Sequence, residues 1–525
     1  LNALCIIVIV LFVSLTRTSM SMTMTPSLAI IGGGFSGLCA AKSAIENGLR
    51  PELFEKQSSI GGLWRPQTGT MWQSLRTNLS QYTCMFSDFP FSVADNFPSH
   101  TQVYEYLKQY VEAFKLEHNA LLHFNHIITR VSREEDGKWR VTWTSPEGDG
   151  SKVFDNIIIS SGFFSEPVNQ KIPQEQPVGT PEIPTIHSSA YRNPADYKGK
   201  VVAVIGAGYS GTEIASDLAK HGVEVVVVAR RKEYILPRYA NEDGKHVPVD
   251  TTMFSRVKAL RKLDPEVRAR WFDSMNKTRQ STVDSISVDN PENPYVAISD
   301  DYVQQVKDNK IKFYHGQPSR IVNDQLYYIK VGKDAEEKES IKIDQVILCS
   351  GFTVNLKYLD QEILDAIHYD PSITFQPMLL HKAVFCQSMP GIAFVGMYRG
   401  PYLPVVELQA RWATGVFANK YQAPAHAAMA EGIQSESEIR NRKPPTQFPR
   451  MYVPYSEDLA KEMNIAPDLE YYKSNNEPLY KMLNEGFFLG ASYRLSDNQD
   501  PVKAAAAKEF IMRISTKPYA MDIQP

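Results

Sequence analysis

Cysteine is scarce in this chain, and the few cysteines are scattered. The 525 residues include five of them, at positions 5, 39, 84, 349 and 386, with no Cys-x-x-Cys pair. This spacing favours reduced thiols and argues against an enzyme that exchanges disulfides. The 11 histidines show no metal-binding spacing, so the sequence predicts no metal site.

The chain also lacks an excess of one charge and a long hydrophobic run. The net charge of −3 gives no reason to expect a nucleic-acid partner. The apolar run at residues 1–15 is shorter than the ~20 residues that span a bilayer. It has neither an initial Met nor a charged leading region, so a signal-peptide core, a truncated anchor and translated upstream sequence stay open. We therefore treat residues 1–26 as a separate N-terminal segment, and we leave open membrane association through residues 1–15.

Residues 27–55 have the pattern of a dinucleotide-binding fold. An apolar strand at 28–31 runs into Gly32-x-Gly34-x-x-Gly37, a helix of small residues follows, and a second strand ends on Glu55. Gly32 makes the tight turn, Gly34 lets the backbone approach a pyrophosphate, and Gly37 lets the helix pack on the strand. The helix N-terminus favours phosphate, and Glu55 is placed to accept hydrogen bonds from a ribose 2′-hydroxyl.

The same pattern returns in the middle of the chain. The strand at 201–205 leads into Gly206-x-Gly208-x-x-Gly211, and the next strand ends on a basic stretch, 229–232, in place of an acid. Cations at that position suit a ribose 2′-phosphate and favour NADPH, with a solvated basic strand end as the alternative. One acidic and one basic nucleotide fold together predict FAD and NADPH in one chain of the α/β class.

Further stretches resemble the flavin-containing monooxygenase family. They are Gly61-Gly-Leu-Trp64, Asn78 in its polar loop, and residues 235–238, 298–301, 407–412 and 493–495. The resemblance covers about residues 27–513 and implies two Rossmann-type dinucleotide-binding domains, with the NADPH domain inserted into the FAD domain. Two nearly identical strands, 155–163 and 344–352, would carry the chain in and out of the insert. The predicted parts are residues 27–175 and 344–525 for the FAD domain with its C-terminal extension, and 176–343 for the NADPH domain.

The resemblance also implies a reaction. NADPH reduces FAD, the reduced flavin forms a C4a-hydroperoxide with O2, and this species oxygenates a soft nitrogen or sulfur nucleophile of a small molecule. Asn78 is the predicted catalytic residue, because its amide can donate and accept at once between flavin, peroxide and NADP⁺. A turn residue bonded to its own backbone is the alternative for Asn78.

The family positions carry over residue by residue to a set of cofactor contacts. The positions implied for FAD are Gly32, Gly33, Gly34, Phe35, Ser36, Gly37, Glu55, Leu63, Trp64, Asn78 and Leu79, with Gln409 on a helix whose start approaches the flavin. The positions implied for NADPH are Thr77, Asn78, Gly206, Gly208, Ser210, Gly211, Thr212, Glu213 and Arg230.

Several positions depart from the family pattern. His187 and Tyr191 of a family fingerprint are present, but Pro181 and Ile183 replace its Phe and first Gly, and Tyr209 stands where the family usually has Asn. These departures keep an uncoupled NADPH oxidase as an alternative. A Baeyer–Villiger oxygenase is a second, although Tyr191 in place of Trp argues against it, and a non-catalytic dinucleotide-binding protein is a third.

The last features of the sequence concern the cellular location of the protein and its assembly. Residues 78–80 form a glycosylation acceptor, and a glycan on Asn78 would abolish the cofactor site. This favours a cytoplasmic enzyme or one on the cytosolic face of the endoplasmic reticulum. The charged stretch 255–291 is interpreted as a lid or an extra surface, and a homodimer is left open.

Overall fold

The computed structural model describes residues 25–66, 69–242, 244–261, 280–288, 295–332, 338–400, 402–496 and 500–516. The apolar segment at 1–15 and most of the predicted lid at 255–291 lie outside these residues. Within the described ranges, no helix is both long and apolar enough to cross a membrane.

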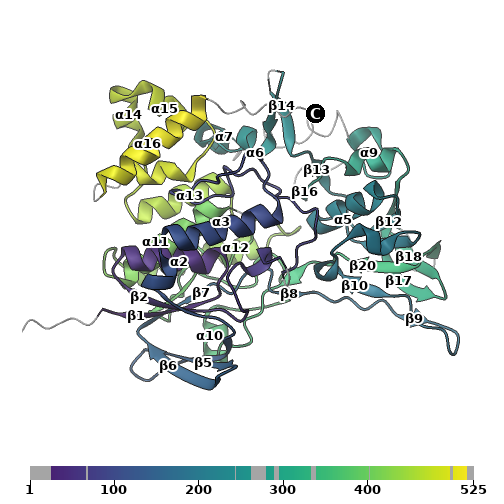
Figure 1. Cartoon of the computed structure of the whole chain (residues 1–525), viewed down its shortest axis with the longest axis horizontal. Coiled ribbons are helices and arrows are strands. Elements are labelled where there is room, and N and C mark those ends of the chain that lie inside the picture. The colour runs from purple at the N-terminus through teal and green to yellow at the C-terminus, as the bar shows by residue number, and fades with distance from the viewer. Residues whose placement is uncertain are drawn as a thin grey trace, which may run out of the picture.

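The first sheet is built from strands that lie far apart in the sequence. Its order is β22-β7-β1-β2-β3, and every neighbouring pair is parallel. The strands are β1 (Ser27–Ile31), β2 (Arg50–Phe54), β3 (Leu121–His123), β7 (Asn156–Ile159) and β22 (Ile392–Phe394). Helices α2 (Phe35–Glu46) and α11 (Leu403–Phe417) lie together on one side of this sheet (Figure 1). Because helices cover the parallel strands, these can be continuous apolar runs.

The second sheet repeats this arrangement. Its order is β10-β20-β11-β12-β17-β18-β19, with β9 paired to β17. The strands are β9 (Gln174–Glu175), β10 (Thr185–His187), β11 (Val201–Ile205), β12 (Glu224–Ala229), β17 (Ile311–Val322), β18 (Gln325–Lys330), β19 (Lys338–Lys342) and β20 (Gln345–Leu348), and the associated helices are α5 (Tyr209–Lys220) and α9 (Tyr302–Lys307). The first five strands of the order are parallel, whereas β18 and β19 add antiparallel pairs at one edge.

The chain crosses twice between the two sheets, which stand side by side in Figure 1. Strand β8 (Glu166–Pro167) on the way out pairs antiparallel with β21 (Phe352–Thr353) on the way back. His187 strengthens the crossing, because its Nε2 lies 3.0 Å from the carbonyl oxygen of Gly351. The second sheet therefore interrupts the first, since β22 follows it in the sequence. This confirms the predicted fold class, while domain boundaries at 175 and 343 stay a prediction.

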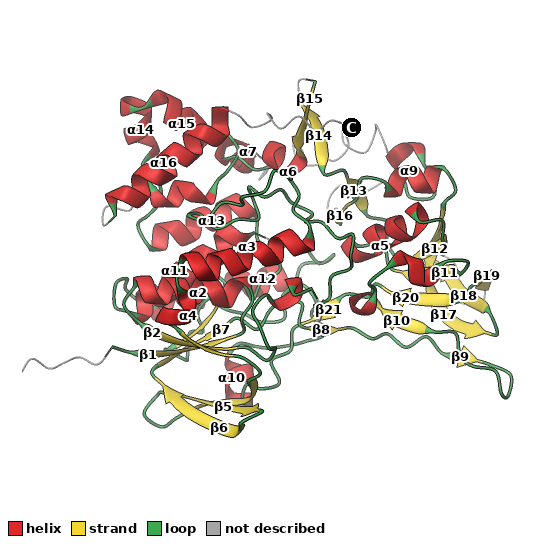
Figure 2. Ribbon diagram, in the orientation of Figure 1, coloured by secondary structure: helices red, strands yellow, loops and turns green. Residues whose placement is uncertain are grey.

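The remaining elements surround these sheets (Figure 2). The strands are β4 (Ile127–Arg133), β5 (Trp139–Ser145), β6 (Gly148–Phe154), β13 (Tyr234–Leu236), β14 (Tyr239–Glu242), β15 (Lys245–Pro248) and β16 (Val296–Ile298). The α-helices are α3 (His100–Ala113), α4 (Leu116–Asn119), α6 (Val249–Met253), α7 (Arg256–Arg261), α10 (Gln361–Ala366), α12 (His426–Arg440), α13 (Tyr452–Glu462), α14 (Leu469–Asn475), α15 (Glu477–Asn484) and α16 (Pro501–Thr516). Single 3₁₀ turns occur at η1 (Gly62–Trp64), η2 (Ser188–Ala190), η3 (Pro194–Tyr197), η4 (Gln280–Thr282) and η5 (Gly490–Arg494).

A buried ion network holds α2 against the C-terminal part of the chain. Arg494 pairs with Glu407 of α11 and lies 3.1 Å from Asp88, which in turn lies 2.5 Å from Lys42 of α2. Burial alone would raise the pKa of Asp88, but Arg494 and Lys42 outweigh it and lower the pKa to about 2. Two stretches singled out in the sequence, 407–412 and 493–495, thus meet in one network that fixes the first nucleotide-binding helix.

Candidate active site

The first glycine-rich turn has a conformation that only glycine tolerates. Gly32 has a φ of +110°, and a Cβ there would lie 2.6 Å from the carbonyl oxygen of Ser160. A Cβ on Gly37 would lie 1.8 Å from the carbonyl oxygen of Gly32. Helix α2 follows directly, and its N-cap Gly34 offers no side chain to the first N–H groups. These donors are therefore free of a side-chain cap and fit a phosphate.

Residues from β2 and η1 complete this end of the first sheet. The Glu55 carboxylate is buried and accepts hydrogen bonds from the N–H groups of Gly33 (2.7 Å) and Gln57 (2.8 Å). Gly62 lies so close to Gly34 that a Cβ on Gly34 would be 3.7 Å from its Cα. The Trp64 ring packs edge-on against the Phe35 ring, 6.3 Å between centroids. The fold thus brings Gly32 to Gly37, Glu55, Leu63 and Trp64 together at the carboxyl ends of β1 and β2, and this cradle fits a dinucleotide.

The second turn has nearly the same backbone geometry at its first and third glycines as the first turn. Gly206 has a φ of +108°, and a Cβ there would lie 2.7 Å from the carbonyl oxygen of Cys349. A Cβ on Gly211 would lie 1.9 Å from the carbonyl oxygen of Gly206, whereas one on Gly208 would meet nothing within 4 Å. The hydroxyl of Thr212 donates to the Gly208 carbonyl at 3.1 Å, and Ser210 is half-buried beside it. This turn also leaves room for backbone to approach a pyrophosphate.

Basic residues stand at the position that Glu55 occupies in the first fold. Arg230 is exposed directly after β12, and its carbonyl oxygen lies 3.2 Å from Nε2 of His315. The Arg231 guanidinium stacks 4.0 Å above the Tyr295 ring. An exposed guanidinium at this strand end fits a 2′-phosphate, and the role of Arg230 stays a prediction.

The loop that carries Asn78 is held by Arg238, which links it to the helix after the second turn. This guanidinium donates to the Thr77 carbonyl at 3.0 Å, to Oδ1 of Asn78 at 3.4 Å and to Glu213 of α5 at 2.6 Å. It also pairs with Asp300 at 3.0 Å. Burial opposes the charge of Arg238, but Glu213 and Asp300 outweigh that effect and raise its pKa.

The amide oxygen of Asn78 has a hydrogen-bond partner, whereas its amide nitrogen has none among the described residues. Its Oδ1 accepts from Arg238 and does not bond to its own backbone, as a simple turn residue would. Its Nδ2 has no hydrogen-bond partner among the described residues, and the side chain is half-buried. The neighbouring Thr77 is buried, and its hydroxyl oxygen also lacks a partner in the described part of the chain. A buried polar atom without a partner is rare and indicates a ligand or water.

Sequence reasoning did not assign two residues that position this loop. Arg238 belongs to a stretch that the family resemblance had singled out, but its role became visible only through its partners. Asp250 carried no signal of its own. It is fully buried and accepts hydrogen bonds from the Ser80 N–H (3.0 Å), the Ser80 hydroxyl (2.7 Å) and the Thr83 hydroxyl (2.7 Å). Burial raises the pKa of Asp250.

Gln409 reaches the first turn through another residue. Its Oε1 accepts from the Gly396 N–H at 2.9 Å, and its Nε2 donates to the Tyr455 hydroxyl at 2.7 Å. Gly396 in turn lies against Ser36, because a Cβ on it would be 1.9 Å from the Ser36 oxygen. Since the Gln409 amide is fully buried and occupied, the geometry supports a positioning role, and direct contact with a cofactor stays a prediction.

The two fingerprint residues that are present, His187 and Tyr191, make structural contacts. His187 binds Gly351 at the crossing, as described above, and the Tyr191 hydroxyl donates to Asp217 of α5 at 2.7 Å. Neither the missing Phe nor the missing Gly of that fingerprint prevents these contacts. Leu79, one residue beyond Asn78, is buried in an apolar cluster that also contains Leu38 of α2.

Two glycine-rich turns without a side-chain cap, each between a parallel strand and a helix, are typical of dinucleotide-binding oxidoreductases. A sequence description of the flavin-binding monooxygenase-like family matches residues 25–517. The chain belongs to this family, and it is a flavin-dependent monooxygenase. It is 28% identical over 496 residues to dimethylaniline monooxygenase (N-oxide-forming) 2 of Cavia porcellus, which covers 89% of this chain and 88% of that protein. Flavin-containing monooxygenase 2 of Homo sapiens is 26% identical over 527 residues, or 92% and 94% of the two chains.

Solved structures share the fold at lower identity. S-allyl-L-cysteine S-oxygenase from Allium sativum has a TM-score of 0.60 at 20% identity, over 93% of this chain and 99% of the other. Cyclohexanone monooxygenase with bound cyclohexanone, in its rotated conformation, has a TM-score of 0.62 at 18% identity, over 83% and 97%. Both support the architecture of two Rossmann-type domains.

Proposed function

We propose that this protein is an NADPH- and O2-dependent monooxygenase that oxygenates soft nitrogen or sulfur nucleophiles of small molecules. When bound, FAD supplies the activation of O2 and the transfer of one oxygen atom, by way of the C4a-hydroperoxide that the family resemblance predicts. The observation that carries the proposal is the Asn78 amide: its Oδ1 is held by Arg238, which also binds Glu213 of α5, and its Nδ2 has no partner among the described residues.

The chain contributes binding, orientation and exclusion of water. The first turn and Glu55 would hold FAD, and the second turn, Thr77 and Arg230 would hold NADPH. Arg238 orients the Asn78 amide so that its N–H can donate to a group bound between the two nucleotides. The Trp64 side chain packs against the apolar cluster that contains residues of α2 and against the one that contains residues of α5, and so helps to keep that space dry.

Cofactor and partner assignments follow from the same proposal. NADPH is the reductant because of the basic end of β12, and O2 and a soft nucleophile are the substrates. Membrane association through residues 1–15, a homodimer, and a cytoplasmic or endoplasmic-reticulum location stay predictions.

The test is a coupled measurement on the purified, FAD-loaded enzyme. NADPH consumption, peroxide release and oxygenated product are followed with a tertiary amine, a thioether and a cyclic ketone. We expect N-oxide and sulfoxide in near-stoichiometric ratio to NADPH consumed. Lactone without sulfoxide would assign the Baeyer–Villiger reaction, and peroxide as the main product with every substrate would assign an NADPH oxidase; either result would overturn the proposal.

A further inference from the structure

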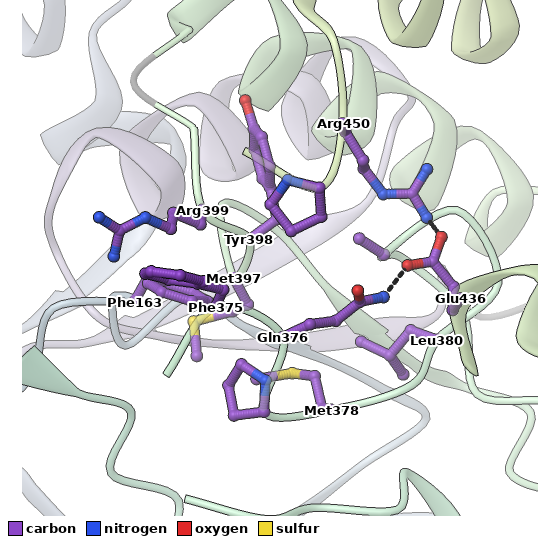
Figure 3. Close-up of a pocket in the computed structure, with 13 residues that line it drawn as sticks. Phe163, Phe375, Gln376, Met378, Leu380, Met397, Tyr398, Arg399, Glu436 and Arg450 are labelled. Carbon is purple, nitrogen blue, oxygen red and sulfur yellow. Dashed lines mark hydrogen bonds and ion pairs between the residues drawn. The ribbon is translucent and has the colours of Figure 1, made fainter. Parts of the chain in front are cut away.

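The cavity in Figure 3 lies at the carboxyl ends of β7 and β22. Arg450 and Gln376 both bind Glu436 in its wall. Its volume is about 20 Å³, which is room for about one water molecule. This cavity is therefore too small to hold a substrate of the proposed reaction.

The hairpin of β14 and β15 begins and ends beside the loop that carries Asn78. Arg238 directly precedes β14, and Asp250 is the second residue of α6, which directly follows β15. The two strands pair antiparallel, and the Val249 N–H donates to the Arg238 carbonyl at 2.8 Å. Arg238 and Asp250 therefore stand at the base of one hairpin of the second fold, a cation at its start and an acid at its end.

The first fold fixes the loop on either side of residues 78–80. The N–H groups of Thr77 and Gln81 donate to carbonyl oxygens in the segment 96–98, at 2.9 Å and 2.7 Å. Between these two bonds, the Asn78 side chain and both the N–H and the hydroxyl of Ser80 bond to the base of the hairpin. The predicted catalytic amide thus takes its position from the second fold as well as from its own.

Asp250 closes the turn that follows Asn78. Its Oδ2 accepts from the Ser80 N–H at 3.0 Å and from the hydroxyls of Ser80 and Thr83 at 2.7 Å each, and the residue is fully buried. The Ser80 carbonyl accepts in turn from the N–H groups of Thr83 and Cys84. Hydroxyl bonds to a carboxylate at this distance are stronger than neutral hydrogen bonds. Asp250 therefore holds the backbone two residues beyond Asn78, while Arg238 holds it from the other side.

We propose that Asp250 is a positioning residue of the oxygenation reaction, because it and Arg238 fix the backbone on both sides of the Asn78 amide. The inference rests on the proposed function and adds that the second fold, besides binding NADPH, sets the direction in which Nδ2 of Asn78 donates. A loop released from Asp250 still permits oxidation of NADPH. Each NADPH then reacts with O2 and a proton to give NADP⁺ and hydrogen peroxide, in place of oxygenated product and water.

The test measures the sulfoxide formed per NADPH consumed by the FAD-loaded enzyme with thioanisole. Asp250→Ala removes the acceptor of all three bonds and should lower this ratio about tenfold. Ser80→Ala removes one of the three bonds and should lower the ratio about threefold. Asp250→Asn keeps an acceptor oxygen for the same donors and should recover most of the wild-type ratio. If Asp250→Ala does not fold, the ratio in Ser80→Ala decides.

Ser27 provides a matched control. Its N–H and its hydroxyl both donate to Oδ2 of Asp155 at 2.8 Å, which is the same pair of bonds that Ser80 makes to Asp250. Ser27 lies at the amino end of β1, whereas the first glycine-rich turn follows the carboxyl end. Ser27→Ala should therefore keep the wild-type ratio of sulfoxide to NADPH. An equal fall in Ser27→Ala and Ser80→Ala would overturn the proposal.

A double-mutant comparison separates positioning from a general loss of structure. In the Asn78→Ala background, Ser80→Ala should change the ratio less than about twofold, because the donor that it positions is already absent. The affinity for NADP⁺, measured by fluorescence titration without turnover, should stay within about twofold of the wild type in Ser80→Ala. The same fall of the ratio in both backgrounds, or a loss of NADP⁺ affinity that accounts for the lower ratio, would contradict the role of Asp250.

The wild-type enzyme distinguishes this role from the proposed function. If the wild type forms neither sulfoxide nor N-oxide, both the proposed function and the role of Asp250 are overturned. If the wild type forms sulfoxide and the ratio is unchanged in Ser80→Ala and Asp250→Ala, only the role of Asp250 is overturned.

Discussion

Asn78 shows what a single side chain contributes at this site. Its Oδ1 is held by Arg238 and its Nδ2 faces no described partner, so Asn78→Ala removes an oriented donor without breaking a core contact. Loss of one such donor costs about 3 kcal/mol in the step it serves. We expect oxygenated product per NADPH to fall about 100-fold while NADPH is still consumed and peroxide is released. Product and peroxide assays measure this, with Asn441→Ala on the exposed end of α12 as the control. An unchanged ratio of oxygenated product to NADPH consumed would refute a catalytic role for Asn78.

Glu233 provides a pH-dependent prediction. Burial raises the pKa of this carboxyl to about 7, although Arg231 and Arg399 partly oppose the shift. Because the folded-state pKa lies above its ordinary value, the stabilisation from the protonated form is full below about pH 4.5 and is lost as the pH rises through 7.

The variant Glu233→Gln should therefore unfold like the wild type at pH 5 and be more stable at pH 8. The gain is at most about 3 kcal/mol, since one pKa unit corresponds to about 1.4 kcal/mol. Urea unfolding at the two pH values tests this, with the exposed Glu431→Gln as the control. Equal effects of Glu233→Gln on stability at both pH values would contradict the raised pKa of Glu233.

At the level of elements, the two strand–turn–helix units can be tested separately. Gly34 and Gly208 both cap a helix with backbone angles that alanine adopts, and a Cβ would meet nothing closer than 3.7 Å at Gly34 and nothing within 4 Å at Gly208. Each alanine variant should fold, but its methyl group would stand where a pyrophosphate must approach.

We expect Gly208→Ala to purify yellow, with normal FAD content and NADP⁺ affinity reduced at least about tenfold. Gly34→Ala should lose FAD. Absorbance at the flavin band and NADP⁺ titration measure the two effects, and each variant is the control for the other. FAD loss in Gly208→Ala, or wild-type NADP⁺ affinity, would show that the second turn is not the nicotinamide site.

Elements differed in how far the sequence could predict them. Both glycine-rich units are predicted well, because local periodicity and glycine spacing specify strand, turn and helix. Strand β17, by contrast, extends to Val322 because its second half pairs antiparallel with β18, a partner that no local signal identifies. Likewise, no local signal shows that Glu436 of α12 is buried.

For the whole molecule, Arg238 is the residue that joins the two folds at the site. It binds the Asn78 loop of the first fold and Glu213 of the second, so Arg238→Met would leave a nearly buried acid without its cation. Breaking a buried pair typically costs 3–5 kcal/mol. We expect a lower unfolding midpoint together with increased peroxide release.

The conservative variant Arg238→Lys separates stability from positioning. Lysine keeps the charge but cannot bridge several acceptors with a planar fork, so it should recover much of the stability while peroxide release stays high. Thermal unfolding and peroxide assays are read on both variants. If Arg238→Met released no more peroxide than the wild type, the function of Asn78 would not depend on its contact with Arg238.

By itself, the sequence determined the two nucleotide-binding units, their acidic and basic strand ends, and the place of the chain in a flavin monooxygenase family. These features are local, because a turn that needs glycine or a strand that ends on an acid is specified within a few dozen residues. Only the tertiary structure decided which side chains meet, such as Arg238 with Asn78 and Asp250 with Ser80. These contacts join residues 160 and 170 positions apart in the sequence, and their partners are chosen by packing between elements.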